Sequence, residues 1–310
     1  MSEPLPPPAG FRIGHWTDEV GRTGCTVVIP PEGTCGGVDV RGGGPGTRET
    51  DVVSPLAGTD RVSAVMFAGG SAYGLAAADG AMRWLEEHGI GYPTPAALVP
   101  IVPAAIVYDL AEGDASARPS ADSGYAACKA AREGVPERGR KGAGAGTAAG
   151  KILGRGAATP SGVGYAALRG GFGATVAALA VVNPFGDVIA RDGTVLAGAR
   201  GDGAPRTAEF IAALDRAPSP AELESRNTTL VSVMTSASLD KAGCARVARA
   251  ASAGIARAVE PVFTDVDGDV VFCLASGKGE PADRFEVIQL ETLAAQVTAE
   301  AIRDAVVSSR

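Results

Sequence analysis

The chain has 310 residues, of which 45% are hydrophobic and 20% charged, with a formal net charge of −7 and a pI near 5.0. This composition permits a large buried core in one or two domains. The basic residues are dispersed along the chain, which excludes the concentrated positive charge typical of nucleic-acid binding.

The amino terminus and the cysteines indicate a cellular location. The opening sequence MSEPLPPPAG has neither a positive segment nor an apolar segment of a signal peptide. No apolar run approaches the roughly 20 residues of a membrane span. The five cysteines are odd in number and contain no CxxC pair, so they predict reduced, mostly buried thiols. We expect a soluble cytoplasmic protein with no membrane partner.

Strands and helices alternate irregularly in the first half of the chain. Apolar and β-branched runs bounded by turn residues predict strands, and capped segments with apolar residues at helical spacing predict helices. In chain order we expect strands at 25–29, 38–40 and 62–68, a helix at 71–88, a strand at 101–108 and a helix at 120–133. Pro100 and Pro103 weaken the strand at 101–108, because proline cannot donate a hydrogen bond to a sheet.

The second half continues in the same way and ends in a long helix. We expect strands at 174–182, 230–234 and 270–274, and helices at 206–217, 238–259 and 284–307. The Ala- and Gly-rich helix at 238–259 suits either a neighbouring subunit or the chain's own core. A hairpin is expected at 263–274 around Asp267-Gly268. Together these elements predict a layered α+β sandwich rather than strict βαβ alternation.

Two segments resemble three kinds of ligand-binding motif but lack features that each motif requires. In the glycine-rich run 141–151, Ala145 replaces a Walker A glycine and Ile152 replaces its Ser or Thr. The same run matches a relaxed dinucleotide pattern, but the segment before it is polar rather than a buried strand. The aspartates at 265, 267 and 269 resemble the start of a calcium loop, yet Val270 occupies its glycine position. We therefore expect neither a cofactor nor a metal.

Histidine is too scarce for the common nucleophilic hydrolases. The chain has only His15 and His88, and no GxSxG elbow. His88 ends a helix-like stretch, where a cation near the last carbonyls is its ordinary role. A Ser-His-Asp hydrolase is therefore disfavoured.

The dipeptide Asn227-Thr228 lies between a polar, proline-marked segment, 214–226, and a strand-like run, 229–237. If the chain were cut here, Thr228 would become an amino terminus. Such a threonine carries both a nucleophilic hydroxyl and an α-amine with a pKa of about 7.7 to 8.0, so it needs no histidine as a base.

Seven stretches taken in order resemble a known family. They are Gly14-His15-Trp16-Thr17-Asp18, Gly24-Cys25-Thr26-Val27-Val28, 38–51 (VDVRGGGPGTRETD), 69–78 (GGSAYGLAAA), 103–110 (PAAIVYDL), Asn227-Thr228-Thr229-Leu230 and 267–277 (DGDVVFCLASG). From about residue 11 to about residue 300 the chain resembles the DmpA-type L-aminopeptidases/D-esterases, which include β-peptidyl aminopeptidases and nylon-oligomer hydrolases.

The resemblance implies the architecture and the processing of the chain. It implies an α/β/β/α sandwich similar to N-terminal-nucleophile hydrolases, and a single catalytic domain, 1–310. It also implies self-cleavage into an α chain, 1–227, and a β chain, 228–310. Family members assemble as homotetramers or larger, which we take as the expectation for this chain.

The resemblance further implies the catalytic residues. Thr228 matches the nucleophile, Lys151 the residue that activates it, and Asn183 an amide donor to the oxyanion. The remaining matches line the pocket or hold the nucleophile, and they are Tyr108, Asp267 and Asp269. Because alternate residues of a strand share a face, we expect both aspartates to point at Thr228, unless the Asp-Gly turn breaks that geometry.

The implied activity is hydrolysis of amide bonds in small peptides or 6-aminohexanoate oligomers through an ester on Thr228, without a cofactor or metal. Two alternatives stay open. The first is an acyltransferase of the ornithine acetyltransferase type, which uses the same nucleophile and passes the acyl group to an amine. The second is an uncut, non-catalytic ligand-binding protein.

Overall fold

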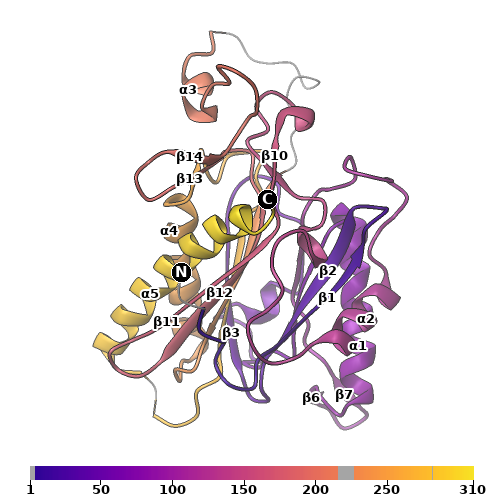
Figure 1. Cartoon of the computed structure of the whole chain (residues 1–310). Coiled ribbons are helices and arrows are strands. Elements are labelled where there is room, and N and C mark those ends of the chain that lie inside the picture. Colours follow the sequence, from indigo (N-terminus) through magenta and orange to yellow (C-terminus); the bar gives the residue numbers. More distant parts are fainter. Residues whose placement is uncertain (1–3, 216–226, 281) are drawn as a thin grey trace.

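Two five-stranded sheets lie face to face, and a pair of helices covers the outer face of each sheet (Figure 1). This computed structural model describes residues 4–215, 227–280 and 282–310. The four layers form the α/β/β/α sandwich expected from the sequence.

The first sheet contains the amino-terminal strands in the order β1-β2-β5-β8-β4. All neighbouring strands are antiparallel except β5 and β8. Its strands are β1 (Arg12–Asp18), β2 (Thr23–Ile29), β4 (Thr47–Arg48), β5 (Val65–Ala68) and β8 (Ala104–Ile106).

The second sheet has the order β11-β12-β15-β17-β3. Here β15 and β17 are parallel and the other pairs are antiparallel. Its strands are β3 (Cys35–Val40), β11 (Val163–Arg169), β12 (Thr175–Asn183), β15 (Thr228–Thr235) and β17 (Val270–Ala275). The strands β12 and β15 are almost entirely buried, as their content of apolar and β-branched residues predicts.

The helices agree with the expected positions. Helices α1 (Ala77–Glu87) and α2 (Ala121–Ala130) cover the first sheet, and α4 (Lys241–Ala256) and α5 (Arg284–Val307) cover the second. The carboxylate of Asp283 caps α5 by accepting from the amides of Phe285 and Glu286. Helix α3 (Thr207–Ala212) is shorter than expected, and residues 216 and 217 of that expectation lie outside the described residues.

Short elements connect these layers. The 3-10 helices are η1 (Asp51–Val53), η2 (Ser71–Ala76), η3 (Gly142–Gly144) and η4 (Arg155–Ala157). The short strands are β6 (Tyr92–Pro93), β7 (Leu98–Val99), β9 (Ala148–Ala149), β10 (Thr159–Pro160), β13 (Asp187–Ile189), β14 (Val195–Ala197) and β16 (Val259–Glu260).

Three apolar clusters fill the spaces between the four layers. In β12, Ala178 and Val182 face the helices α4 and α5, whereas Leu179 and Val181 face the other sheet. The central cluster joins both sheets, and Phe67 and Phe272 meet there with ring centroids 6.1 Å apart. This alternation fixes which side chains of β12 and β15 lie between the sheets.

The expected hairpin at 263–274 is wrong, and the small residues of helix α4 pack in the chain's own core. Residues 263–274 form no hairpin: β17 pairs in parallel with β15 and antiparallel with β3. The Asp267-Gly268 turn therefore brings the chain into a strand that pairs with distant segments. Helix α4 buries eight residues against the second sheet and α5, so the chain's own core accounts for its small residues.

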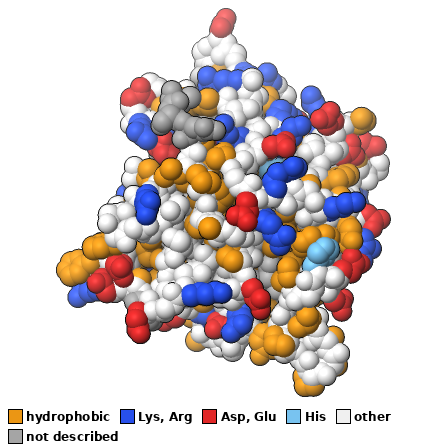
Figure 2. All heavy atoms as spheres, turned by 60° about the horizontal axis from the view of Figure 1, so that its bottom comes forward, with side chains coloured by type: hydrophobic (Ala, Val, Ile, Leu, Met, Phe, Trp, Pro, Cys, Tyr) orange, Lys and Arg blue, Asp and Glu red, His pale blue; other side chains and the backbone are white. Residues whose placement is uncertain are grey.

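The surface and the thiols agree with the composition. Figure 2 shows positive and negative side chains interspersed over one face of the molecule. Within the described ranges, every cysteine is a free thiol, and four of the five are buried. No described helix has the length and apolar character needed to cross a membrane.

Candidate active site

The ends of two central strands bring Asn183 and Thr228 side by side. The last residue of β12, Asn183, pairs with the first residue of β15, Thr228. This end of the second sheet lies toward β13 and β14 (Figure 1). Thr228 shares its side of the strand with Leu230 and Met234, whose side chains lie between the two sheets. Most of the polar segment 214–226 before it lies outside the described residues.

The Thr228 hydroxyl is directed at the carbonyl group of the preceding residue. Its Oγ1 donates to the Asn227 carbonyl oxygen at 2.5 Å. The same oxygen accepts a hydrogen bond of 2.8 Å from the Gly268 amide. Both donors polarise the Asn227 carbonyl, and the Gly268 amide is positioned to stabilise negative charge on this oxygen.

Lys151 is fully enclosed beside this peptide bond. Its Nζ donates to the carbonyl oxygens of Asn183 (2.7 Å) and Pro184 (3.1 Å) and to Oδ1 of Asn227 (2.9 Å). Three acceptors match the three hydrogens of an ammonium group. Burial, and then the charge of Arg155, lower the pKa of Lys151 well below its usual value. The ammonium is thus well anchored, but it holds its proton less tightly than an exposed lysine does.

The Asn183 side chain is held by two backbone groups. Its Oδ1 accepts from the Ala148 amide at 3.2 Å, and its Nδ2 donates to the Tyr108 carbonyl oxygen at 3.2 Å. An amide nitrogen carries two hydrogens, and this contact uses one of them. Tyr108, which follows β8 and is partly buried, therefore contributes a backbone carbonyl that orients Asn183.

The two aspartates lie on either side of the Asn227-Thr228 bond. Asp267 accepts from the Phe185 amide (3.1 Å) and from both the amide and the hydroxyl of Thr264. Asp269 accepts from the Thr229 amide at 2.5 Å. Within the described part of the chain, neither Asp267 nor Asp269 accepts a hydrogen bond from the Thr228 hydroxyl. The aspartates hold the backbone around the nucleophile rather than the hydroxyl itself.

The protonation of Asp269 makes stability depend on pH. Burial, and then the charge of Asp267, raise the pKa of Asp269 from 3.8 to about 8. The folded protein thus binds this proton more tightly than the unfolded chain does. The stabilisation is complete below pH 4 and is lost as the pH rises through about 8.

We expect Asp269→Asn to remove this dependence, because asparagine keeps an acceptor for the Thr229 amide and cannot ionise. The free energy of unfolding of the wild type should fall by a few kcal/mol between pH 4 and pH 8 relative to that of the variant. Urea titrations across this range measure the difference, with the exposed Asp202→Asn as a control. Parallel curves for wild type and Asp269→Asn would contradict the prediction.

The glycine-rich loop at 42–46 supports the Asp267-Gly268 turn. Gly44 donates to the Asp267 carbonyl at 2.9 Å. A Cβ on Gly42, whose φ is +77°, would lie 2.2 Å from that carbonyl oxygen, and one on Gly268 would lie 2.4 Å from the Gly44 oxygen. Only glycine allows these backbones to approach so closely, and the approach fixes the Gly268 amide beneath Asn227.

Neither histidine lies among these residues. His15 is partly buried in β1, where it shares a hydrogen bond of 2.9 Å with Thr26, and loss of solvent around its ring lowers its pKa to about 4. His88 follows α1, contacts the Trp84 carbonyl and stacks on the Trp84 ring. The location of His88 agrees with its expected place at a helix end.

Several residues that the sequence did not single out complete the site. Arg155 donates to the Tyr108 carbonyl at 3.3 Å and pairs with Glu112 at 2.6 Å. Asp109, which is buried, accepts from the Gly70 amide at 2.6 Å and thus ties the Gly69-Gly70 turn to the segment of Tyr108. These contacts join segments far apart in sequence, so no local pattern identifies them.

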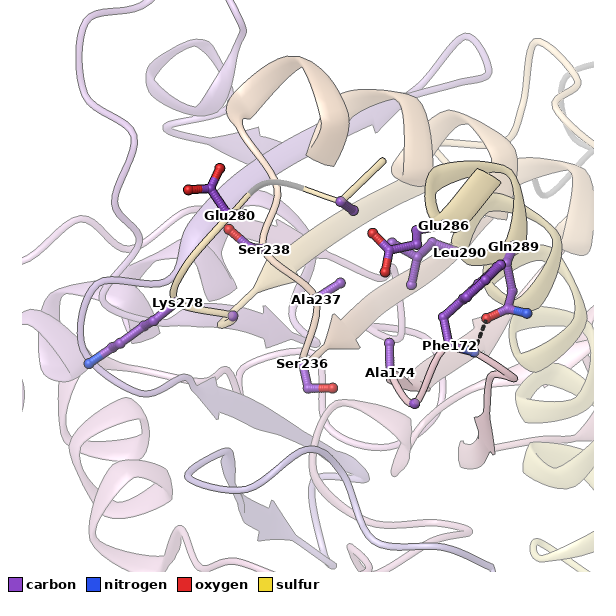
Figure 3. Close-up of a pocket in the computed structure, with 13 residues that line it drawn as sticks. Phe172, Ala174, Ser236, Ala237, Ser238, Lys278, Glu280, Glu286, Gln289 and Leu290 are labelled. Atoms are coloured by element: carbon purple, nitrogen blue, oxygen red, sulfur yellow. Dashed lines mark hydrogen bonds between the residues drawn. The ribbon is translucent and has the colours of Figure 1, made fainter. Parts of the chain in front are cut away.

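A cavity of about 350 Å³ lies at the opposite end of β15, between Phe172, Ser236 and Gln289 (Figure 3). Seven strand steps separate Thr228 from Thr235, or roughly 24 Å. This cavity is therefore too distant to hold a substrate at Thr228.

Comparison with solved structures places the fold. The chain aligns with a β-aminopeptidase of a Burkholderia species at a TM-score of 0.74 and 21% identity, covering 100% of this chain and 89% of that one. It also aligns with the L-aminopeptidase D-Ala-esterase/amidase of Ochrobactrum anthropi, which is described as a variant of the Ntn hydrolase fold. Here the TM-score is 0.72 and the identity 18%, and the alignment covers 97% of this chain and 85% of the other. The four-layer sandwich is thus of the Ntn hydrolase type.

Sequence comparison defines the family. Residues 9–310 match Peptidase family S58. The chain is 46% identical over 305 residues to an uncharacterized aminopeptidase of Mycobacterium leprae, covering 90% of this chain and 80% of the relative. It is 30% identical over 275 residues to a 6-aminohexanoate-oligomer endohydrolase of an Agromyces species, covering 86% and 73%. The chain belongs to peptidase family S58 and is a hydrolase of that family.

Proposed function

We propose that this chain is a self-processing amidase and aminopeptidase whose nucleophile is Thr228. The observation that carries the proposal is the contact of the Thr228 hydroxyl with the Asn227 carbonyl, whose oxygen also accepts from the Gly268 amide. A hydroxyl and an amide donor at one peptide bond support self-cleavage with Thr228 as the nucleophile. The catalytic domain in this proposal comprises residues 1–310.

The first reaction is cleavage of the Asn227-Thr228 bond. The Thr228 oxygen attacks the Asn227 carbonyl carbon, while the Gly268 amide stabilises the oxyanion. The hydroxyl proton reaches the Thr228 nitrogen as the C–N bond breaks, which leaves an ester and a free amine. Water then hydrolyses the ester, giving an α chain, 1–227, and a β chain, 228–310, that begins with Thr228.

The second reaction is hydrolysis of an external amide. The Thr228 amine accepts the hydroxyl proton as the oxygen attacks the substrate carbonyl, and it passes that proton to the leaving amine. The second Nδ2 hydrogen of Asn183 serves the oxyanion, and Lys151 stabilises negative charge nearby. Water activated by the same amine then releases the acid.

The names of the relatives support the substrate class that we propose. The names of the relatives refer to amino-terminal peptide residues and to 6-aminohexanoate oligomers. We propose short peptides or ω-amino-acid oligomers for this chain, hydrolysed without a cofactor by a homo-oligomer of αβ units. A panel consisting of an amino-acid anilide, a β-dipeptide and a linear 6-aminohexanoate oligomer identifies the preferred class.

Two measurements test the proposal. Intact-mass spectrometry of the purified protein should show two chains that divide between Asn227 and Thr228, whereas a persistent 310-residue species would exclude the mechanism. Acid release should not require an added amine. Turnover that depends on an amine acceptor would favour an acyltransferase of the ornithine acetyltransferase type.

A further inference from the structure

A second cavity, of about 310 Å³, is lined in part by residues that contact the framework of the candidate active site. Segments from both halves of the sandwich form it, including the β1–β2 turn, the chain after Tyr108, β9, η4 and β10. Its lining residues are Arg22, Ala111, Glu112, Arg140, Thr147, Ala148, Arg155, Gly156, Ala158, Pro160 and Arg200. Its volume is within the range that small ligands occupy in proteins.

The charge of this cavity is unbalanced. Four arginines line it, and Glu112 is the single carboxylate among the lining residues. Glu112 is already engaged by Arg155 at 2.6 Å, and Arg22 lies 3.9 Å from its other oxygen. Burial, and then the positive charge of Arg22, lower the pKa of Arg140, whereas the charge of Glu112 raises it. Arg22 and Arg140 are like charges that repel each other. A bound anion would relieve this repulsion.

Backbone contacts hold three of the guanidinium groups in place. Arg140 donates to the Ala145 carbonyl at 2.7 Å, Arg155 to the Gly146 carbonyl at 2.9 Å and Arg200 to the Gly156 carbonyl at 2.8 Å. Each guanidinium has five N–H donors, so these contacts leave others for a ligand. Arginines fixed in this way suit the two oxygens of a carboxylate.

The cavity shares residues with the framework of the active site. Ala148 lines it and donates its amide to Asn183. Arg155 lines it and donates to the Tyr108 carbonyl, which also orients Asn183. The cavity wall is therefore linked to the proposed oxyanion donor through Ala148 and through the Tyr108 carbonyl.

We infer that this arginine-lined cavity binds the terminal carboxylate of a short substrate, on the leaving-amine side of the scissile bond. The inference rests on the proposed function and specifies its substrate class. The enzyme selects short peptides or oligomers with a free carboxylate over the same molecules with a neutral end.

Hydrolysis of a matched pair tests the selection. L-Ala-L-Ala and its terminal amide are compared by release of the first residue. We expect kcat/KM of the wild type to be higher for the free acid than for the amide. The double variant Arg22→Gln and Arg200→Gln should lower kcat/KM for the free acid about tenfold per arginine, mainly by raising KM. The value for the amide should not change. Arg169→Gln, an exposed substitution at the far end of β11, is the control for charge.

Binding to Thr228→Ala tests the cavity without any turnover. Calorimetric titration should show that N-acetyl-L-alanine binds more tightly than its amide, and the Arg22 and Arg200 substitutions should remove the difference. Equal binding of acid and amide, or an unchanged ratio in the variants, overturns the inference. Arginine-dependent binding of inorganic phosphate without binding of the carboxylate also overturns it. If the wild type hydrolyses none of the substrates, the proposed function is wrong. The titration still shows whether the cavity binds a carboxylate.

Discussion

Thr228→Ala is expected to remain a single 310-residue chain and to hydrolyse no amide. The substitution removes the hydroxyl that contacts the Asn227 carbonyl, so no ester forms and the bond stays intact. Without cleavage the α-amine is never released, and the proposed base is lost together with the nucleophile. Removal of a nucleophile of this kind lowers the rate by a factor of roughly 10⁴ or more.

Denaturing gels and intact-mass spectra measure the cleavage, and acid release from the preferred substrate measures the activity. Thr228→Ser is the matched variant, because it keeps a hydroxyl at this position and should still be cut. Thr229→Ser changes the neighbouring residue, which lies on the opposite side of the strand, and should also be processed. Processed and active Thr228→Ala protein would refute the assignment.

The layers were predictable because burial leaves a periodic trace in the sequence. In α5 the expected range equals the observed Arg284–Val307, since apolar residues recur at helical spacing and Asp283 supplies a capping box. The buried strands β12 and β15 appear as runs rich in apolar and β-branched residues. These patterns depend on local spacing alone, so one sequence suffices to detect them.

In the two large sheets, the strands that escaped prediction are the edge strands β1, β4 and β11. Strand β1 contains Arg12, His15 and Asp18 and is only half-buried, so it has no apolar signature. Strand β11, at the edge of the second sheet, is buried only in its first three residues. The expected hairpin at 263–274 failed for a related reason: its Asp-Gly turn signal is local, whereas the partner of β17 is set by packing of distant segments.

In the site, too, some residues are indicated by their neighbours in sequence and others only by contacts between distant segments. Thr228 stood out from its own neighbours, but Lys151 and Asn183 were suggested by family resemblance alone. The structure brings Lys151, Asn183 and Asn227 into direct contact. The Gly268 amide and Arg155 are detectable only in three dimensions, because a backbone donor has no sequence pattern of its own and an arginine acquires its role from its neighbours.

Lys151→Met is expected to slow self-cleavage by roughly two to four orders of magnitude, so that uncut chain accumulates. Methionine matches the length of lysine but cannot donate, so the Asn227 side chain loses its charged partner. It also removes a buried positive charge that contacts the residue before the scissile bond. Time courses of cleavage after purification, followed by intact mass, measure the rate.

Loss of stability alone could also slow cleavage, and Lys241→Met separates the two effects. Lys241 likewise donates to three carbonyl oxygens, those of Val52, Ala57 and Thr59. These acceptors belong to the segment 52–59 and not to β15. Its loss should also lower the free energy of unfolding, because three partly buried acceptors lose their charged donor. Only the Lys151 variant should then lose processing. Equal loss of cleavage in both would show that Lys151 supports the fold rather than the chemistry.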